Sequence, residues 1–301
     1  MIKTRVIPVL LVQDGLLKKR IKFNETRTIA NPVTIARVFE SRRSDELILL
    51  DIGKTVDDDD IDPYLISQIA EELYMPFAYG GGIDNVDKMY EVIKNGAEKV
   101  VINSAAVQDP TLITKGSKKF GSQCIVVSID AKSTGPNTYE IFTHGGRVAT
   151  GLDAIEWTKQ MVELGAGEIL LTCIDHDGIG EGLDVSTAKA VSKVLKIPLI
   201  VSGGCGLASH FVDGFKSAGA DAVFDLGTHN NRIVLGNNNI TNSYIKVDWT
   251  VTSDERDKTD IQDITTGLDF VNQLKPKSFW FRKERGSDVK HGTKRLGFIA
   301  Q

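Results

Sequence analysis

Cysteine is scarce in this chain, and so are the features of a secreted or membrane protein. Cys124, Cys173 and Cys205 each lie in or beside a strand-like apolar run. They predict buried thiols in a reducing compartment rather than a disulfide framework or a metal site. No apolar run is long enough to span a bilayer, and no signal peptide is present at the amino terminus. We therefore expect a cytoplasmic protein with no membrane partner, no metal and no cofactor.

An excess of charge of either sign is also lacking. The chain has 36 Lys and Arg against 40 Asp and Glu, which gives a formal net charge of −4. Attraction to nucleic acid through bulk charge needs a positive excess, so no nucleic-acid partner is expected. Hydrophobic residues make up 41% of the 301 positions, which is ordinary for a globular chain of one large domain or two smaller ones.

What the chain does have is a repeating unit of a short apolar run with a polar end, followed by a helical stretch. Helix starts are indicated where asparagine or aspartate precedes proline, at Asn31-Pro32 and Asp62-Pro63. Further helical stretches are expected at 85–94, 153–164, 184–195 and 207–217. The runs that predict buried parallel strands cover residues 5–12, 46–51, 76–79, 99–103, 124–130, 168–175, 198–202 and 219–224.

The two halves of this pattern superimpose. Glu46 and Glu168 are 122 positions apart, and so are the glycine pairs Gly81-Gly82 and Gly203-Gly204. A constant offset indicates a duplicated half-barrel of four strand–helix units. Right-handed crossovers close eight such units into an α/β (βα)8 TIM barrel. We expect the barrel at residues 1–224 with an incomplete eighth unit, an Asn-rich β-like junction at 225–248, and a separate segment at 249–301.

The strand ends carry the candidate chemistry. Asp130 ends the run that begins at Cys124, and a carboxylate at the carboxyl end of a barrel strand points into the active-site mouth, although a helix cap or an ion pair is an alternative interpretation. Glycine turns let the backbone approach an anion, so the two duplicated glycine pairs predict two phosphate cradles. The implied substrate has a phosphate at each end, with Asp130 between them for acid–base work. The basic stretch at residues 18–22 is interpreted as a solvated loop face.

Residues 1 to about 223 resemble the cyclase subunit of imidazole glycerol phosphate synthase, a lyase of histidine biosynthesis. In that family ammonia comes from a glutamine amidotransferase (glutaminase) partner on the far face of the barrel and passes along the barrel axis to a phosphorylated substrate. The motifs that carry the resemblance are Arg5-Val6-Ile7-Pro8, Asp14-Gly15, Glu46 to Asp51, Gly80-Gly81-Gly82-Ile83, Lys99 to Asn103, Phe120-Gly121-Ser122-Gln123, Ser128-Ile129-Asp130-Ala131-Lys132, Gly165 to Thr172, Asp175 to Gly178, and Ser202-Gly203-Gly204.

The resemblance implies three groups of site residues. A ring of alternating charge also has an interpretation as internal salt bridges alone, whereas in this family the ring is the ammonia gate. The residues implied are the catalytic Asp130, Lys19 and Asp175; the substrate- and phosphate-binding Asp51, Gly81, Gly82, Asn103, Ser104, Asp177, Gly178, Ser202, Gly203 and Gly204; and the gate Arg5, Glu46, Lys99 and Glu168.

The chain departs from the family at its first strand. The family has an aspartate there as the second proton-transfer group, and this chain has Leu11, which cannot transfer a proton. Leu11, the stretch 77–80 and His144-Gly145-Gly146 favour a paralogue branch found beside sugar amidotransferases in surface-polysaccharide clusters and associated with amidino sugars, over a true histidine-pathway enzyme. At the eighth strand, Asp225 is expected to repel phosphate.

From about residue 229 the chain resembles a different family, the self-cleaving intramolecular chaperone of phage tail fibres and endosialidases (peptidase S74). The stretch 249–261 carries Ser253 and Lys258, which match that family's serine nucleophile and lysine base. We expect the module to be truncated at Gln301, uncleaved and poorly ordered. A virion structural protein with the barrel as a passenger is the alternative function, and the sequence leaves open whether the join is natural or a chimera.

Overall fold

The computed structural model describes residues 4–23, 25–54, 60–135, 138–224, 277–282 and 290–297. The chain divides into two compact units, Met1–Thr241 and Asn242–Gln301. The first contains the predicted barrel. Within the described ranges, no helix is both long enough and apolar enough to cross a membrane.

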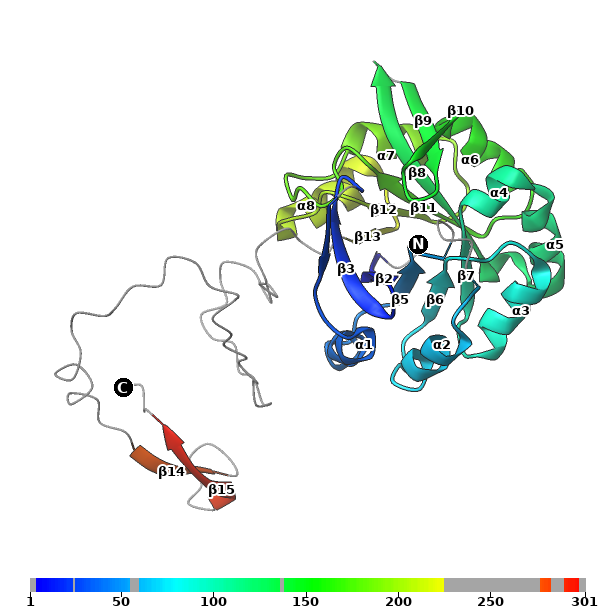
Figure 1. The fold of residues 1–301 in the computed structure, drawn as a ribbon. Coiled ribbons are helices and arrows are strands. Elements are labelled where there is room, and N and C mark those ends of the chain that lie inside the picture. The colour runs from blue at the N-terminus through cyan, green and yellow to red at the C-terminus, as the bar shows by residue number, and fades with distance from the viewer. Residues whose placement is uncertain are drawn as a thin grey trace. The chain divides into compact units, whose positions relative to one another are not determined.

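Parallel strands form a closed ring in the first unit, as the sequence pattern predicts (Figure 1). The ring closes because its first strand position is split at Ile7-Pro8: β1 pairs with β13, and β2 pairs with β5. Proline has no N–H to donate to a ladder, which explains the interruption. In ring order the strands are β1 (Arg5–Val6) with β2 (Val9–Gln13), β5 (Leu47–Asp51), β6 (Phe77–Gly80), β7 (Lys99–Ile102), β8 (Ile125–Gly135), β11 (Glu168–Cys173), β12 (Leu199–Ser202) and β13 (Ala222–Phe224).

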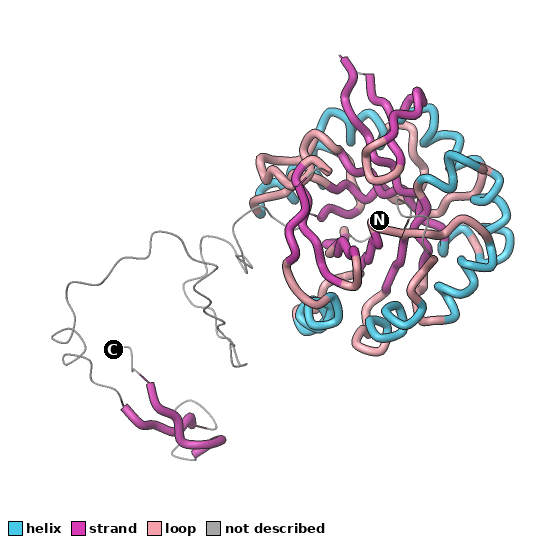
Figure 2. The backbone as a smooth tube through the Cα atoms, in the orientation of Figure 1, coloured by secondary structure: helices cyan, strands magenta, loops and turns pink. Residues whose placement is uncertain are grey.

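Helices surround this ring on its outer side (Figure 2). The predicted starts are confirmed: Asn31 Oδ1 accepts hydrogen bonds from the amides of Val33 and Thr34, and Asp62 Oδ1 accepts one from Leu65. The helices are α1 (Pro32–Ser41), α2 (Pro63–Ala70), α3 (Val86–Lys94), α4 (Ser104–Gln108), α5 (Thr111–Phe120), α6 (Ala154–Glu163), α7 (Val185–Ser192) and α8 (Ala208–Asp213), with a 3-10 turn η1 (Ser122–Cys124) and a π-helical turn η2 (Gly214–Ala218).

Each barrel strand is apolar on both faces because it separates two cores. In β5, Leu47 and Leu49 pack against the helices, whereas Ile48 between them points into the barrel. This alternation is the two-residue period of a strand. The core inside the barrel is small and consists of Ile7, Val9, Ile48, Ala78, Val101, Val126, Leu170, Ile200 and Ala222.

Two antiparallel excursions extend the sheet beyond the ring. The first is β3 (Leu16–Ile21) with β4 (Glu25–Thr28), attached to β2, and the second is β9 (Thr138–Thr143) with β10 (Val148–Asp153), attached to β8. The basic stretch at residues 18–22 was interpreted from its composition as a loop face, and this is wrong. It lies mostly in β3, and Arg20 within it is only 4% exposed.

The duplication of the two half-barrels is visible in the backbone. Gly81 and Gly82 have φ values of 116° and 69°, and Gly203 and Gly204 have 93° and 102°. Both pairs adopt the positive-φ conformation that favours glycine, after the equivalent strands β6 and β12. The predicted pairing of half-barrels therefore holds in geometry as well as in spacing.

In the second unit the structure describes a β-hairpin, β14 (Lys277–Arg282) paired antiparallel with β15 (Lys290–Gly297). Its register shifts between Phe279 and Phe281. Ser253 and Lys258 lie outside the described residues, and so does Asp225. The expected boundaries at residues 224 and 248 stay predictions.

Candidate active site

A cavity of about 410 Å³ opens at the carboxyl ends of the barrel strands. Its walls include the strand ends of β2, β5, β6, β7 and β8 and the excursion strand β3. Predicted site residues that line this pocket are Lys19, Asp51, Gly81, Gly82, Asn103, Ser104, Asp130, Asp177, Gly178 and Ser202, and Leu11 lines it as well.

Asp130 is the buried carboxylate of the pocket. It lies on β8, 7% exposed, and Asn103 Nδ2 donates a hydrogen bond of 2.9 Å to its Oδ2. Burial raises the pKa of Asp130 to about 7; the Asn103 bond and the Arg20 charge oppose this rise, and the Asp177 charge adds to it. A carboxyl group that titrates near neutrality can both give and take a proton at physiological pH. Asp130 therefore has the properties of a general acid–base.

Gly81 and Gly82 form the wall of the pocket beside β5. A Cβ at Gly81 would stand 2.3 Å from the carbonyl oxygen of Asp51, so glycine is required by space as well as by φ. Asn103 and Ser104 lie after the next strand, β7, at the start of α4, where Ser104 Oγ accepts a hydrogen bond of 3.0 Å from the His144 amide. The structure thus brings together the residues of the first predicted phosphate cradle.

The second predicted cradle is placed differently. Ser202 lines the pocket, whereas Gly203 and Gly204 do not. The Gly204 carbonyl accepts a hydrogen bond of 2.7 Å from the Gly182 amide, and a Cβ at Gly204 would meet the Gly182 carbonyl oxygen at 2.1 Å. This glycine turn is packed against the loop that follows β11.

The sixth-strand carboxylates are also separated by the fold. Asp177 lines the pocket, and burial raises its pKa to about 6 against the opposing charges of Arg20 and Lys19. Asp175 is not among the pocket-lining residues, and its Oδ2 accepts a hydrogen bond of 3.2 Å from the Ser133 amide. Of the two carboxylates, Asp177 is the one placed to meet a ligand.

Asp51 is a further carboxylate of the pocket, at the end of β5. It is 5% exposed, and burial raises its pKa to about 6 although the Gly53 amide donates a hydrogen bond of 3.2 Å to its Oδ1. The pocket therefore holds three carboxyl groups that titrate well above their usual range.

Arg20 and His144 are among the pocket residues that were missed in the sequence. Arg20 was taken for a surface residue, and His144 was used only as a mark of the paralogue branch. Both come from the antiparallel excursions, Arg20 from β3 and His144 from the turn after β9. Residues 16–21 are Leu-Leu-Lys-Lys-Arg-Ile, which do not alternate between apolar and polar, so the sequence held no periodic signal for Arg20.

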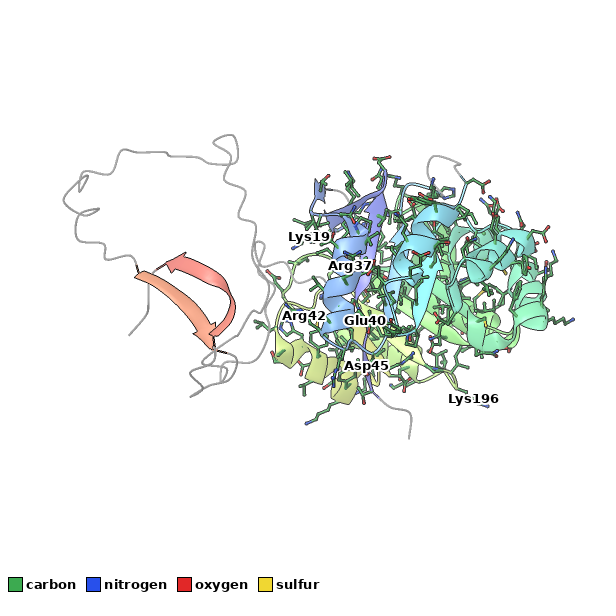
Figure 3. All side chains as sticks on the ribbon, turned by 90° about the horizontal axis from the view of Figure 1, so that it is seen from below. Lys19, Arg37, Glu40, Arg42, Asp45 and Lys196 are labelled. Atoms are coloured by element: carbon green, nitrogen blue, oxygen red, sulfur yellow. The ribbon has the colours of Figure 1, made fainter. Side chains whose placement is uncertain are left out.

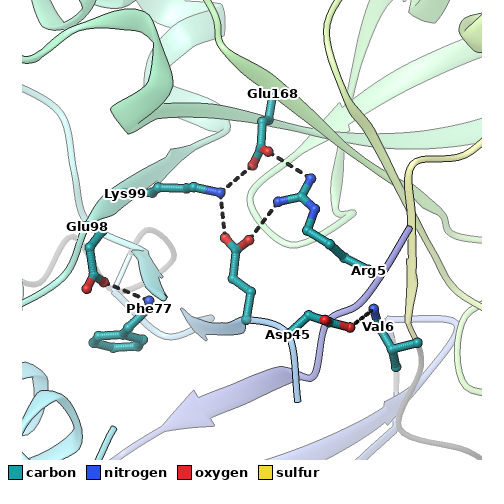
Figure 4. Close-up of polar contacts among 8 residues, drawn as sticks. Arg5, Val6, Asp45, Phe77, Glu98, Lys99 and Glu168 are labelled. Atoms are coloured by element: carbon teal, nitrogen blue, oxygen red, sulfur yellow. Dashed lines mark hydrogen bonds and ion pairs between the residues drawn. The ribbon is translucent and has the colours of Figure 1, made fainter. Parts of the chain in front are cut away.

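At the other end of the barrel four charged side chains form a closed ring (Figure 4). Lys99 Nζ lies 2.7 Å from Glu46 Oε1 and 2.8 Å from Glu168 Oε2. Arg5 Nη1 donates to Glu46 Oε2 at 2.7 Å, and Arg5 Nη2 lies 2.8 Å from Glu168 Oε1 without hydrogen-bond alignment, as an ion pair. Charge alternates around the ring, so each of its members has two partners of opposite sign.

The charged ring and the pocket lie on the same inner face of the barrel. Lys99 and Val101 are alternate residues of β7, and Asn103 follows the end of that strand, so the three lead from the ring through the inner core to the pocket. Glu168, Leu170 and Thr172 follow the same order on β11. The two-residue period of a strand therefore stacks a charged layer, an apolar layer and a polar layer along the barrel axis.

Residues on the outside of the barrel can also be assigned to its pocket end or its ring end. In Figure 3, Lys19 lies at the pocket end, and Asp45 and Lys196 lie at the ring end. Next to the ring, Asp45 Oδ2 accepts a hydrogen bond of 3.0 Å from the Val6 amide, and Glu98 Oε2 accepts one of 2.7 Å from the Phe77 amide. These carboxylates hold the amino ends of strands β1 and β6.

Neither a disulfide nor a metal cluster is found in the described ranges. Cys173 and Cys205 are buried, and Cys124 is partly exposed. Among the described residues no group of three or more His, Cys, Asp or Glu side chains could hold a metal ion.

Two family models match the chain. Residues 5–226 match the model described as histidine biosynthesis protein, and this match covers most of the chain. Residues 253–301 match the model described as chaperone of endosialidase. Both matches agree with the two resemblances found in the sequence, and the first spans the whole barrel.

Proposed function

This chain belongs to the histidine biosynthesis protein family, and we propose that its barrel is a cyclase-type synthase that adds ammonia to a phosphorylated substrate. A glutamine amidotransferase subunit supplies the ammonia at the ring end of the barrel. The substrate binds in the pocket at the opposite end. Cys173 and Cys205, which are buried and form no disulfide in the described residues, support a cytoplasmic location.

The observation that carries this proposal is the stacking of the charged ring below a carboxylate pocket on one inner face. A purely structural salt-bridge ring could lie anywhere in the fold, but this ring encloses the barrel axis beneath Asp130. The layer between them is apolar, with Ile48, Val126 and Leu170 fully buried. An apolar layer disfavours ammonium, whose charge would lose its hydration, and admits uncharged ammonia.

In the pocket, the backbone of Gly81 and Gly82 takes a phosphate of the substrate, because glycine leaves the amide groups accessible. Asp130 transfers the proton, since its pKa of about 7 matches the working pH. Asn103 holds the Asp130 carboxylate through its 2.9 Å hydrogen bond. Lys19, from β3, contributes a positive charge at the pocket wall.

Leu11 favours the amidino-sugar paralogue branch over histidine biosynthesis. It lines the pocket on β2 at the position where the family's second proton-transfer carboxylate is expected. Loss of one general acid or base typically lowers a rate by ~10²–10⁴-fold. We therefore expect the natural substrate to be a sugar derivative handled together with a sugar amidotransferase.

The proposal is tested by measuring where the nitrogen of glutamine or ammonium is incorporated. Purified barrel chain is mixed with the glutaminase subunit and amide-¹⁵N glutamine, or with ¹⁵N ammonium alone. One reaction contains the bisphosphorylated ribotide of the histidine pathway, and a second contains an acetamido nucleotide sugar with its amidotransferase. Incorporation of ¹⁵N into the sugar product is expected. No incorporation from either nitrogen source into either substrate, with the fold intact by circular dichroism, would refute the proposal.

A matched pair of variants tests the route through the barrel. Val126 points into the barrel and Val127, the next residue, packs against the helices. Val126→Phe should reduce incorporation from glutamine while leaving incorporation from ammonium. Val127→Phe adds the same volume to the outer core and should affect both sources alike, which separates a blocked route from a strained fold.

A second candidate function rests on the match of residues 253–301 to the chaperone of endosialidase model. Under this alternative the chain is a virion structural protein that cleaves itself at Ser253 with Lys258 as base. Intact-mass measurement on freshly purified protein tests it, with Ser253→Ala as the control. Cleavage beside Ser253 that the variant abolishes would favour this function.

A further inference from the structure

Arg20 is a buried guanidinium, and two of its three nitrogens have no hydrogen-bond partner within the described part of the chain. It lies on β3 and lines the pocket with 4% of its surface exposed. Its Nε and Nη1 atoms are inaccessible to solvent and have no hydrogen-bond partner among the described residues. A buried donor without a partner loses its hydration without compensation.

Two glycines pack closely against Arg20. Gly145 and Gly178 both have positive φ, at 64° and 72°. A Cβ at Gly145 would stand 3.0 Å from Arg20 Nη1, and a Cβ at Gly178 would stand 2.3 Å from the Arg20 carbonyl oxygen. The guanidinium and its backbone are thus enclosed by the turn after β9 on one side and by the loop after β11 on the other.

Neighbouring charges do not satisfy Arg20. Asp130 and Asp177 are close enough to favour its charge, yet no ion pair within 4.0 Å joins it to either carboxylate in the described residues. Burial, and then the charge of Arg147, lower the pKa of Arg20 from its usual value. Because the pKa of Asp130 is about 7, that carboxyl is partly neutral at physiological pH and compensates the guanidinium incompletely.

We propose that Arg20 binds a second oxyanion of the substrate, a carboxylate or a second phosphate, apart from the phosphate held at Gly81 and Gly82. The guanidinium fork offers parallel N–H donors that match either oxyanion, and such bonds are among the strongest in proteins. Arg20 thereby supplies the second anion contact that the sequence assigned to Gly203 and Gly204, which do not line the pocket. This inference rests on the proposed function, because it assumes that the pocket holds the substrate.

Four sugar compounds separate the possibilities in calorimetric titrations of the full chain. Ribose 5-phosphate has one phosphate, ribulose 1,5-bisphosphate has two, 6-phosphogluconate has a phosphate and a carboxylate, and gluconate has a carboxylate alone. At least one of the two-anion compounds should bind about 10–100-fold more tightly than ribose 5-phosphate. The tighter of the two identifies the second oxyanion as phosphate or carboxylate.

Arg20→Gln should remove this advantage and leave the affinity for ribose 5-phosphate unchanged. Arg147→Gln is the matched control, because it removes the same charge from an exposed neighbour. The Arg147→Gln variant should still bind a two-anion compound more tightly than ribose 5-phosphate. The thermal midpoint of Arg20→Gln should equal or exceed that of the parent, since a guanidinium without hydrogen-bond partners stabilises the fold little.

Each contrary result has a distinct meaning. An advantage that survives Arg20→Gln, or an equal loss of ribose 5-phosphate binding in that variant, overturns the inference and leaves the pocket's proposed function intact. A lowered midpoint together with that equal loss assigns Arg20 a structural role and also overturns it. If no phosphate compound binds the parent, but gluconate binds and Arg20→Gln abolishes this, the proposed function fails and the Arg20 site stands.

Discussion

The two ends of the barrel bury charge in opposite ways. In the charged ring every member is paired, with Lys99 and Glu46 2.7 Å apart and the other contacts at 2.7–2.8 Å. In the pocket, Asp130 and Asp177 have raised pKa values, and Nε and Nη1 of Arg20 lack hydrogen-bond partners in the described residues. A satisfied network stabilises one geometry, whereas unsatisfied groups are available to a ligand. The comparison separates an end of the barrel whose charges are paired with one another from an end whose charges are left for a ligand.

The largest expected effect comes from removing the acid–base group of the pocket. Asp130→Asn keeps the shape of the side chain and its neighbour Asn103 but cannot transfer a proton. Turnover in the ¹⁵N assay should fall by ~10²–10⁴-fold. Asp175→Asn is the control, because Asp175 does not line the pocket and should change the rate little. Equal losses in the two variants would contradict the assignment of the proton transfer to Asp130.

A substitution in the charged ring should lower the free energy of unfolding. Glu46 is 2% exposed and pairs with both cations of the ring, so Glu46→Ala leaves Arg5 and Lys99 partly buried with one partner fewer. We expect a loss of about 3–5 kcal/mol in the free energy of unfolding, measured by urea denaturation. Glu72→Ala breaks an ion pair with Arg37 on the surface and should leave the midpoint unchanged. A similar small change in both variants would mean that the ring is not a stabilising network.

The pocket carboxylates should make stability depend on pH in an unusual direction. Asp130 has a pKa of about 7 in the folded state, whereas in the unfolded chain it returns to its ordinary value near 3.8. Between these values the folded state binds the extra proton, so this group's contribution to stability is present below about pH 4 and is lost as pH rises through 7. The slope for one group reaches about 1.4 kcal/mol per pH unit.

This is measured as a difference between parent and variant, because exposed carboxylates contribute slopes of the opposite sign. Urea denaturation at pH 5 and pH 8 should show a smaller decline in Asp130→Asn than in the parent. At pH 8 the variant should be the more stable of the two. Parallel declines would show that Asp130 is already ionised in the folded protein at low pH.

The smallest expected effect comes from Asn103. Its Nδ2 donates to Asp130 and lowers the pKa of that carboxyl against the effect of burial. Asn103→Ala removes the donor, so the pKa of Asp130 should rise above 7 by about one unit. A carboxyl-¹³C titration by NMR measures this directly. Ser104→Ala, at the next residue, should leave the pKa of Asp130 unchanged. A shift of the same size in that variant would mean that loosened packing causes the effect.

The barrel could be predicted from the sequence because its determinants are local. Runs such as 46–51 are apolar on both faces, and caps such as Asn31 and Asp62 lie next to prolines that start helices. The ring was predicted through the family resemblance, and its members face one another because strand alternation leaves no other choice. Position in the chain and the two-residue period determine both features.

Arg20 and the Gly203–Gly204 turn could not be predicted in the same way. The pairing of β3 with β2 brings Arg20 over the barrel mouth, and that pairing joins strands through the turn at Asp14 and Gly15. The Gly204 turn has the pattern of a phosphate cradle, but the Gly182 amide bonds its carbonyl. The hairpin itself is local, but the enclosure of Arg20 by the turns at Gly145 and Gly178, like the bond between Gly182 and Gly204, depends on contacts between separate loops, which carry no periodic signal.

Because the first strand is split, the barrel closes through the short pairing of β1 with β13. β1 meets β13 through only two residue pairs, Arg5 with Ala222 and Val6 with Val223, the shortest register among the parallel pairs of the described strands. Arg5 also reaches across to Glu46 and Glu168. Arg5 therefore has two roles. Its side chain completes the charged ring, and its backbone pairs with β13 at the junction where the barrel closes. A change that breaks the contacts of Arg5 in the ring therefore also weakens the junction that closes the barrel.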